Sequence, residues 1–368
     1  MDLHTPALSE FPASKMGTEE DKKDLKCLGD RPKRAPTTSL LPMEEMDVRL
    51  RIIDVIREKL ERWNGSETQL TYLQFSALLL MPLDFLMNLK ESFPGSLQHD
   101  ISVEYIQASL FFFMKGRTPG SVAASDADQD GSQGTSEATY RDAVERTKCR
   151  ARDTHTCILT QSTLPDVSVC HFLPFSIGAT EENMAYFKKC GFLMYAFSFG
   201  TDQYETARTM AEQRGWLDKA WNMVCLDRQL RAWWAEGYFA LKYLETIQKS
   251  EIESIVQIQF YWMPRNGLDY GRECSIHQDV VERMLCTAPG RDGFTGGTTK
   301  SGQSLETGQI FEIIVSPEEA PKMRLVIDTQ WAMIRLAALS GAVGHMDRLD
   351  KEYIDPWDED DEHFKECI

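Results

Sequence analysis

The sequence predicts an α+β protein, in which a helical N-terminal segment is followed by a domain that mixes strands and helices. Two patterns support this prediction. Apolar residues recur with helical spacing between residues 43 and 114, and β-prone runs are interspersed with helical patterns between residues 139 and 345. The chain has 368 residues, of which 42% are hydrophobic, so it can bury a large core in one long domain or two ordinary ones.

Composition predicts an intracellular protein of the cytoplasm or nucleus. The nine cysteines are an odd number without a CxxC pair, which favours reduced thiols over a disulfide framework. The N-terminus lacks the apolar core of a signal peptide, and the longest apolar run, FSALLLMPLDFLM, is too short and interrupted for a transmembrane segment. The net charge of −17 counts against a protein whose whole surface binds nucleic acid.

The chain divides into five parts by composition. Residues 1–42 are polar and aperiodic and predict a flexible lead-in, and residues 43–114 predict a small helical unit that packs or binds a protein partner. Residues 115–138 are rich in Gly, Ser and Asp and predict a disordered linker. Residues 139–345 form the second domain, and residues 346–368 are a solvated acidic tail.

The second domain is predicted to open with a short helix from Tyr140 to about Arg152. Two β-prone runs, CILTQ and VSVCHFLPF, follow around the turn-forming STLPD and predict a hairpin. Later patterns predict two helical stretches, TEENMAYFKKCGFLMYAFS and YETARTMAEQRGWLDKA, a strand, helix and strand in WNMVCLDRQLRAWWAEGYFALKYL, strands in SIVQIQFYWMP and IFEIIVS, and a closing helix in MRLVIDTQWAMIRLAALSGAV.

The order strand, strand, helix around His171 is the core arrangement of ββα-metal nucleases. At this point the sequence resembles the HNH nuclease family, and specifically the HNH-domain proteins common in filamentous fungi. The resemblance covers about residues 140–343 and is carried by RDTHTCILTQ, CHFLPFS, WNMVCLDRQLRAWWAEGYFALKYL and the later strands and closing helix. It implies an elaborated ββα-metal (HNH-like) domain that hydrolyses phosphodiester bonds of nucleic acids with a divalent metal.

Phosphodiester hydrolysis needs a general base and a divalent ion that neutralises charge on the phosphate. The resemblance assigns the role of base to His171 and implies that Asn222 orients it. In the family a further histidine on the following helix holds the metal, but Arg231 stands there, and a guanidinium has no lone pair to donate. Cys170 and Asp227 are the remaining candidate ligands for Mg²⁺ or Zn²⁺, and their mismatched softness predicts a degenerate site. His155 is a more distant candidate.

Three functions remain open on the sequence alone. The first is a degenerate metal-dependent endonuclease that binds nucleic acid through a basic cluster, which is equally explained as a solvated helix face: Arg141, Arg146, Lys148, Arg150 and Arg152. The second is an inactive binding or scaffold protein, in which Arg231 replaces the positive charge of the metal and His171 is a hydrogen-bonded, half-buried residue. The third is an enzyme that reuses the pocket for a small molecule.

Overall fold

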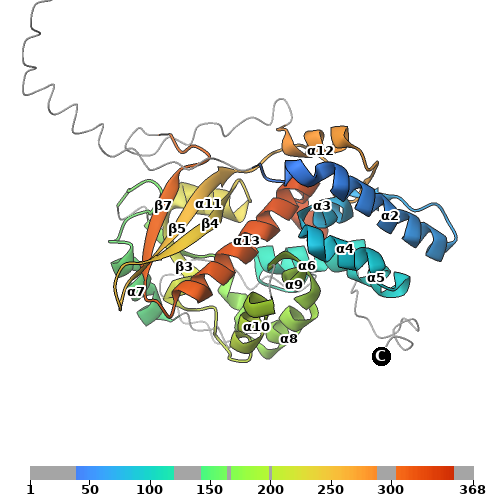
Figure 1. The fold of residues 1–368 in the computed structure, drawn as a ribbon. Helices are drawn as coiled ribbons and strands as arrows, with labels where there is room; N and C mark the ends of the chain where they lie inside the picture. Colours follow the sequence, from blue (N-terminus) through green and yellow to red (C-terminus); the bar gives the residue numbers. More distant parts are fainter. Residues whose placement is uncertain (1–38, 120–141, 164–166, 199–200, 288–303, 352–368) are drawn as a thin grey trace, which may run out of the picture. The chain divides into compact units, whose positions relative to one another are not determined.

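A computed structural model describes residues 39–119, 142–163, 167–198, 201–287 and 304–351. Within these ranges helices and sheets are mixed, which confirms the predicted α+β class (Figure 1). The elements in chain order are η2 (Met43–Glu45), α2 (Met46–Asn64), β1 (Leu70–Thr71), α3 (Tyr72–Leu80), α4 (Leu83–Glu91), α5 (Pro94–Asp100), α6 (Val103–Lys115), α7 (Ala143–Arg152), β2 (Val167–His171), η3 (Phe175–Gly178), α8 (Glu181–Lys189), α9 (Gly191–Ser198), α10 (Thr201–Met210), η4 (Ala220–Asn222), β3 (Met223–Asp227), α11 (Arg228–Ala235), β4 (Phe239–Gln248), β5 (Ser254–Trp262), β6 (Glu273–Cys274), α12 (Gln278–Leu285), β7 (Ile310–Val315), α13 (Ala320–Ser340), η5 (Ala342–His345) and α14 (Met346–Lys351).

The N-terminal segment is helical, as its spacing predicts. Helix α3 begins with a capping box, in which the Thr71 hydroxyl accepts from the backbone N–H of Gln74 and the Gln74 side chain accepts from the N–H of Thr71. Helices α2 and α6 end at Gly65 and Gly116, whose left-handed φ angles of 68° and 69° suit glycine. Sequence signals at the helix ends therefore set where these helices stop.

Three antiparallel sheets lie within the described part of the chain. Strands β4, β5 and β7 form a three-stranded sheet in that order, whereas β2 pairs with β3 and β1 pairs with β6. The β4–β5 ladder shifts register between Tyr243 and Glu245, which marks a bulge. The strands predicted in SIVQIQFYWMP and IFEIIVS are confirmed as β5 and β7.

The predicted hairpin between CILTQ and VSVCHFLPF is wrong. The CILTQ stretch is a closed turn, because the N–H of Cys157 donates to Ser162 and the N–H of Gln161 donates to Cys157. Among the described residues of this stretch, strand-like pairing is limited to a single bridge between Thr156 and Thr163. Strand β2 instead pairs with β3, and the helices α8, α9 and α10 lie between these two strands in the sequence. Backbone N–H and C=O groups that a strand would use to pair with its neighbour are bonded within this turn.

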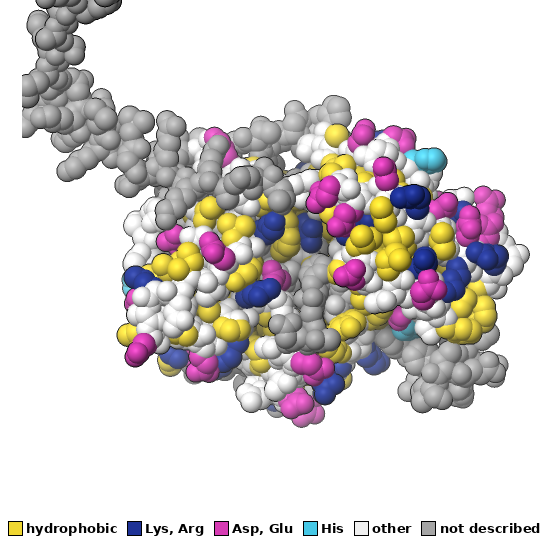
Figure 2. All heavy atoms as spheres, in the orientation of Figure 1, with side chains coloured by type: hydrophobic (Ala, Val, Ile, Leu, Met, Phe, Trp, Pro, Cys, Tyr) yellow, Lys and Arg dark blue, Asp and Glu magenta, His cyan; other side chains and the backbone are white. Residues whose placement is uncertain are grey.

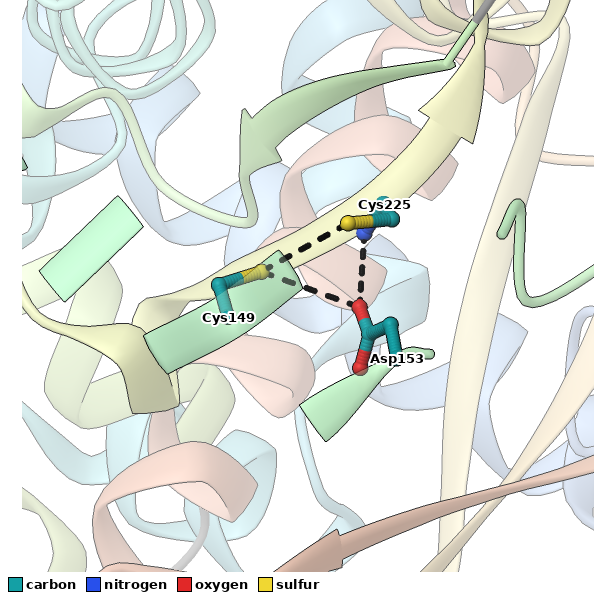
Figure 3. A group of neighbouring side chains, drawn as sticks. All are labelled: Cys149, Asp153 and Cys225. Carbon is teal, nitrogen blue, oxygen red and sulfur yellow. Dashed lines mark hydrogen bonds between the residues drawn. The ribbon is translucent and has the colours of Figure 1, made fainter. Parts of the chain in front are cut away.

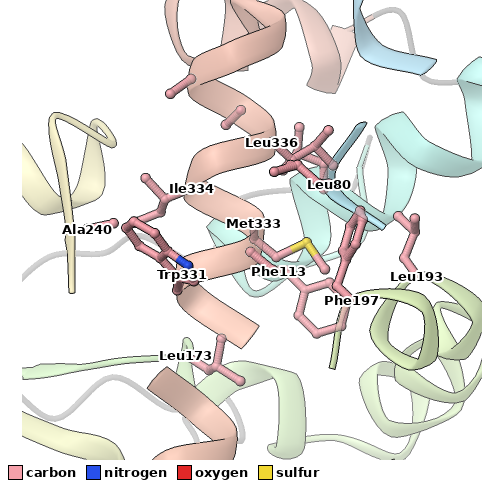
Figure 4. Packing of buried hydrophobic residues seen from close by; sticks show 14 of the residues in the cluster. Leu80, Phe113, Leu173, Leu193, Phe197, Ala240, Trp331, Met333, Ile334 and Leu336 are labelled. Atoms are coloured by element: carbon pink, nitrogen blue, oxygen red, sulfur yellow. The ribbon is translucent and has the colours of Figure 1, made fainter. Parts of the chain in front are cut away.

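The long helix α13 forms the centre of the core. It packs on β4 and β5 and also on α3, α6 and α9. Figure 4 shows Trp331 beside Ala240 of β4, and Met333 directed toward Phe113 of α6 and Phe197 of α9. Each of these side chains is at most 8% exposed. Burial of apolar surface around α13 thus joins elements from both ends of the chain into one hydrophobic cluster.

Some of the predicted chain divisions can be compared with the described residues. Most of the predicted linker, and the tail from residue 352 onward, lie outside the described residues. The predicted lead-in ends in an ordered contact, since Leu41 is 2% exposed and the carbonyl of Leu40 accepts from Arg335. None of the described helices is by itself long and apolar enough to cross a membrane, and only α3 and α4 taken together meet those criteria, with a bend of 118° between them.

Candidate functional site

The antiparallel pairing of β2 with β3 places the candidate site. His171 lies opposite Met223 at one end of the pair, and Val167 lies opposite Asp227 at the other. Because directly opposed residues share a face and neighbours in a strand alternate, His171 and Asp227 lie on one face and Cys170 lies on the other. The two faces of this small sheet therefore carry different candidate residues.

Each face is packed against a different helix. On the face of His171, the Sγ atom of Cys149 in α7 lies 4.0 Å from the Sγ atom of Cys225 in β3. On the face of Cys170, the ring of Trp234 in α11 lies 5.9 Å from the ring of Phe172, which continues the alternation beyond the strand end. The sheet is thus enclosed between α7 and α11.

His171 is paired with a carboxylate that the sequence reasoning missed. Its Nε2 atom lies 3.1 Å from Oδ1 of Asp218, and the two side chains are each 11% exposed. The other carboxylate oxygen of Asp218 accepts from the backbone N–H of Asp142 at 2.6 Å. The Phe175 ring lies 5.4 Å from the imidazole, centroid to centroid. The carboxylate therefore joins the histidine to the start of α7.

The contact with Asp218 has a definite chemical consequence for the imidazole. A carboxylate at one ring nitrogen orients the ring and favours the tautomer protonated on that nitrogen. In the neutral ring the proton then lies on Nε2 and the lone pair on Nδ1. His171 and Asp218 thus form a pair of the kind that can carry out proton transfer, although the low exposure of both side chains restricts contact with solvent.

Asn222 fixes the backbone beside His171 without an observed contact to the ring. This residue is fully buried, its Oδ1 atom accepts from the N–H of Leu173 at 3.0 Å, and its Nδ2 group donates to the carbonyls of Leu173 and Leu217. Its own carbonyl accepts from the N–H of Phe172. Asn222 therefore holds the backbone that directly follows β2.

The structure does not bring the predicted metal ligands together. The thiol of Cys170 donates to the carbonyl of Ser168 on the face of α11. Asp227 lies on the opposite face, four residues along the sheet from the level of His171, which corresponds to about 13 Å. Both of its oxygens already accept hydrogen bonds, from the N–H of Leu230 at the start of α11 and from the hydroxyl of Thr160. Cys170 and Asp227 therefore cannot share one ion in this arrangement.

The donor set does not fit the divalent metal that the sequence resemblance implies. Arg231 lies on α11, one turn before Trp234, on the helix that covers Cys170. A guanidinium at that position supplies positive charge and no lone pair. Cys170 is then the one predicted donor on that side, and a single thiolate is a poor match for Mg²⁺. His155 is exposed in the turn after α7 and is not placed near these residues by any observed contact.

Two residues of the predicted basic cluster are engaged in contacts within the protein. The side chain of Arg152 is 12% exposed and donates to Asp153 and to the carbonyls of Ala220 and Met223. Lys148 is paired with Glu145 at 2.9 Å, and Arg141 lies outside the described residues. Figure 2 shows basic and acidic side chains interspersed over the visible face rather than gathered by sign. At least one of the predicted phosphate-binding residues is therefore a structural one.

A second group of reactive side chains lies between α7 and β3. The Sγ atom of Cys149 is 3.7 Å from Oδ2 of Asp153 and 4.0 Å from Sγ of Cys225, and the donor atoms of all three residues lie within 4.8 Å of one another (Figure 3). All three residues are buried. The hydrogen bond with Cys225 and burial together raise the pKa of the Cys149 thiol. In the protein without a bound ion this thiol is therefore protonated at neutral pH.

The segment that connects α7 to β2 is strained. Thr154, His155 and Gln161 have φ angles of 53°, 58° and 57°, and they are the non-glycine residues with positive φ in the part of the chain that the structure describes. Each such conformation costs about 1–3 kcal/mol and persists only where neighbouring contacts impose it. Here the N–H of Ile158 donates to the carbonyl of Cys225, and the carbonyl of Asp153 accepts from two threonine hydroxyls. Two of the three strained residues, Thr154 and His155, directly follow Asp153.

Sequence reasoning missed Asp218 and the Cys149 group for related reasons. Asp218 is an isolated acidic residue in the apolar stretch GWLDKAW, and that isolation is the signal that could have identified it. Cys149 and Cys225 are separated by 76 residues, so no local spacing connects them. No protein-family model matches the chain, and no curated protein or solved structure matches it either.

Proposed function

We propose that the chain is an HNH-type ββα protein that has lost metal-dependent hydrolysis and serves as a binding module. The observation that carries this proposal is the β2–β3 pair followed by α11, in which His171 lies at a strand end and the predicted metal ligands are separated by the sheet. A catalytic site of this type needs the general base and the metal ion close to the same scissile phosphate. Arg231 on α11 stands in for the charge of the ion.

The buried pairing of His171 favours the binding module over an active nuclease. A general base must reach a water molecule, yet the ring is 11% exposed and one nitrogen is committed to Asp218. Asn222 anchors the adjacent backbone with three side-chain hydrogen bonds. His171 and Asn222, which match catalytic residues of the nuclease family, are retained because they hold the sheet to its surroundings.

Cleavage of plasmid DNA tests this proposal. The wild-type protein should produce little or no nicking in magnesium, manganese, nickel or zinc, while mobility-shift and pull-down measurements report binding. His171→Ala should leave that background unchanged. Robust cleavage that depends on a divalent ion and disappears in His171→Ala would overturn the proposal.

The substitution Arg231→His tests the assignment of the helical position. It should raise the affinity for Ni²⁺ by about tenfold or more, because an imidazole on α11 joins Cys170 on the side of the sheet that this helix covers. The measurement is a metal titration, carried out in a Cys149→Ser background so that the thiol group near α7 does not contribute. Arg228→His is the matched control, since Arg228 is exposed at the start of the same helix. Equal affinities of the two variants would contradict the assignment.

The pair of His171 and Asp218 supports one alternative function. A histidine oriented by a carboxylate is competent for acid–base catalysis without any metal, so the same residues can serve an enzyme acting on a small molecule. The two functions differ in their dependence on Asp218. A small-molecule activity should fall steeply in Asp218→Asn, which keeps the shape of the side chain and removes its charge, whereas a binding module should retain its partner in that variant.

A further inference from the structure

Cys149, Asp153 and Cys225 come from two elements and converge on one point. Cys149 lies on α7, Asp153 caps the C-terminal end of that helix, and Cys225 lies at the middle of β3. Cys149 and Cys225 are fully buried, and Asp153 is 8% exposed. In Figure 3 the two sulfur atoms and a carboxylate oxygen point toward one another across the space between helix and strand. This convergence is independent of His171 and of the function proposed above.

The spacing of the donor atoms suits a tetrahedral ion. Zinc binds thiolate sulfur at about 2.3 Å and carboxylate oxygen at about 2.0 Å, which places two sulfurs about 3.8 Å apart and a sulfur and an oxygen about 3.5 Å apart. The corresponding distances here are 4.0 Å between Cys149 and Cys225 and 3.7 Å between Cys149 and Asp153. These two distances differ from the tetrahedral values by about 0.2 Å, and the donor atoms of Cys225 and Asp153 lie within 4.8 Å of each other.

Charge balance favours a dication over other ions at this buried position. The carboxylate of Asp153 is paired with Arg152, whose Nε atom lies 2.6 Å from Oδ1. A zinc ion that displaces both thiol protons adds two positive charges while two thiolates form. The two thiolates offset the charge of the ion and Arg152 offsets that of Asp153, so the bound group has no net charge. A monovalent ion such as Cu⁺ would leave one uncompensated negative charge.

Neighbouring groups already orient the donors. Nη2 of Arg152 donates to Sγ of Cys149 at 3.5 Å, and the backbone N–H of Cys225 donates to Oδ2 of Asp153 at 2.8 Å. Donors of this kind stabilise thiolate and carboxylate ligands and fix their direction. The three protein donors leave one tetrahedral position for a water molecule.

We propose that Cys149, Asp153 and Cys225 form a binding site for a thiophilic divalent cation, with Zn²⁺ as the preferred ion. Two soft sulfur donors select zinc over magnesium or calcium. The bound ion would tie α7 to β3 and so hold the face of the sheet that carries His171.

Metal binding by the reduced full-length chain tests this proposal. After incubation with Zn²⁺ and removal of excess ion, metal analysis should find one zinc per chain, and calorimetry should find one binding site per chain. Cys149→Ser and Cys225→Ser should each weaken binding by at least about tenfold, because each removes a thiolate. Cys157→Ser is the matched control, since Cys157 is equally buried and lies outside the group, and it should bind as the wild type does.

A measurement on the unaltered protein keeps the test valid if the serine variants do not fold. Co²⁺ in place of zinc should give a thiolate-to-cobalt charge-transfer band together with the visible spectrum of a tetrahedral ion. The proposal is overturned if the wild-type chain retains no zinc, if zinc binding survives in both Cys149→Ser and Cys225→Ser, or if the cobalt complex shows no thiolate band. Nuclease activity plays no part in any of these readouts, so the fate of the binding-module proposal does not affect the result.

Discussion

The side chain of Asn222 makes three hydrogen bonds to buried backbone groups next to β2. Its substitution by alanine should lower the free energy of unfolding by about 3 kcal/mol or more, because three hydrogen bonds to buried backbone groups are lost together. Chemical denaturation with an unchanged m-value is the measurement. Asn64→Ala is the matched control, since Asn64 is exposed, and it should cost less than about 0.5 kcal/mol. A loss below 1 kcal/mol for Asn222→Ala would remove the anchoring role.

Substitution of His171 distinguishes the two proposed functions, because a binding module and an enzyme should respond to it differently. In a binding module, His171→Ala should cost about 1–3 kcal/mol, because the buried Oδ1 atom of Asp218 then loses its contact with the imidazole. In an enzyme the stability should be nearly unchanged while activity disappears. We expect the first outcome, measured by thermal and chemical unfolding. A variant that loses neither stability nor binding would exclude both roles for this residue.

At this scale the sequence predicted residue types better than residue partners. It proposed His171 and Asn222 for one site, and Asn222 bonds the backbone just beyond His171 at the end of β2. It paired Cys170 with Asp227 as ligands, although strand alternation puts them on opposite faces. That error follows from the strand pairing, since only the true partner β3 and its register show which side chains share a face.

At the scale of elements, helix ends are where single residues matter most. Gly341 ends α13 at φ 82°, and a Cβ atom there would lie 2.2 Å from the carbonyl oxygen of Leu268. Gly341→Ala should therefore destabilise the protein by clearly more than the cost of about 1 kcal/mol for a left-handed alanine. Gly65→Ala provides the comparison, because Gly65 ends α2 at φ 68° with no atom near its added Cβ. Equal losses of stability in the two variants would show that backbone conformation, and not the clash, sets the cost.

Most helices and strands were predictable because their signals are local. The helices α7, α11 and α13 and the strands β5 and β7 follow apolar periodicity within single stretches of sequence. The pairing of β2 was not predictable in this way. The nearby CILTQ has strand-forming residues, but its backbone closes a turn, and β3 lies beyond three intervening helices. Local propensity cannot distinguish a near partner from a distant one.

For the whole molecule, the contact of the N-terminal helices with α13 determines the result of a backbone cut. Limited proteolysis should cleave first between residues 115 and 138, where the sequence has little apolar content, and denaturing gels should show a fragment that starts near residue 140. The two fragments should nevertheless elute together under native conditions, because α3 and α6 bury side chains against α13. Native separation of the fragments, or earlier cleavage within residues 157–244, would contradict this expectation.

The central position of α13 also bears on the order in which the protein acquires its structure during synthesis. A ribosome releases α3 and α6 long before it reaches residue 320, so the apolar surface that they bury against α13 stays uncovered while about 200 residues are added. Contacts between such distant segments form slowly, and exposed apolar surface in the meantime favours association with other chains. The nascent protein should therefore rely on chaperones until its last long helix emerges and completes the interior.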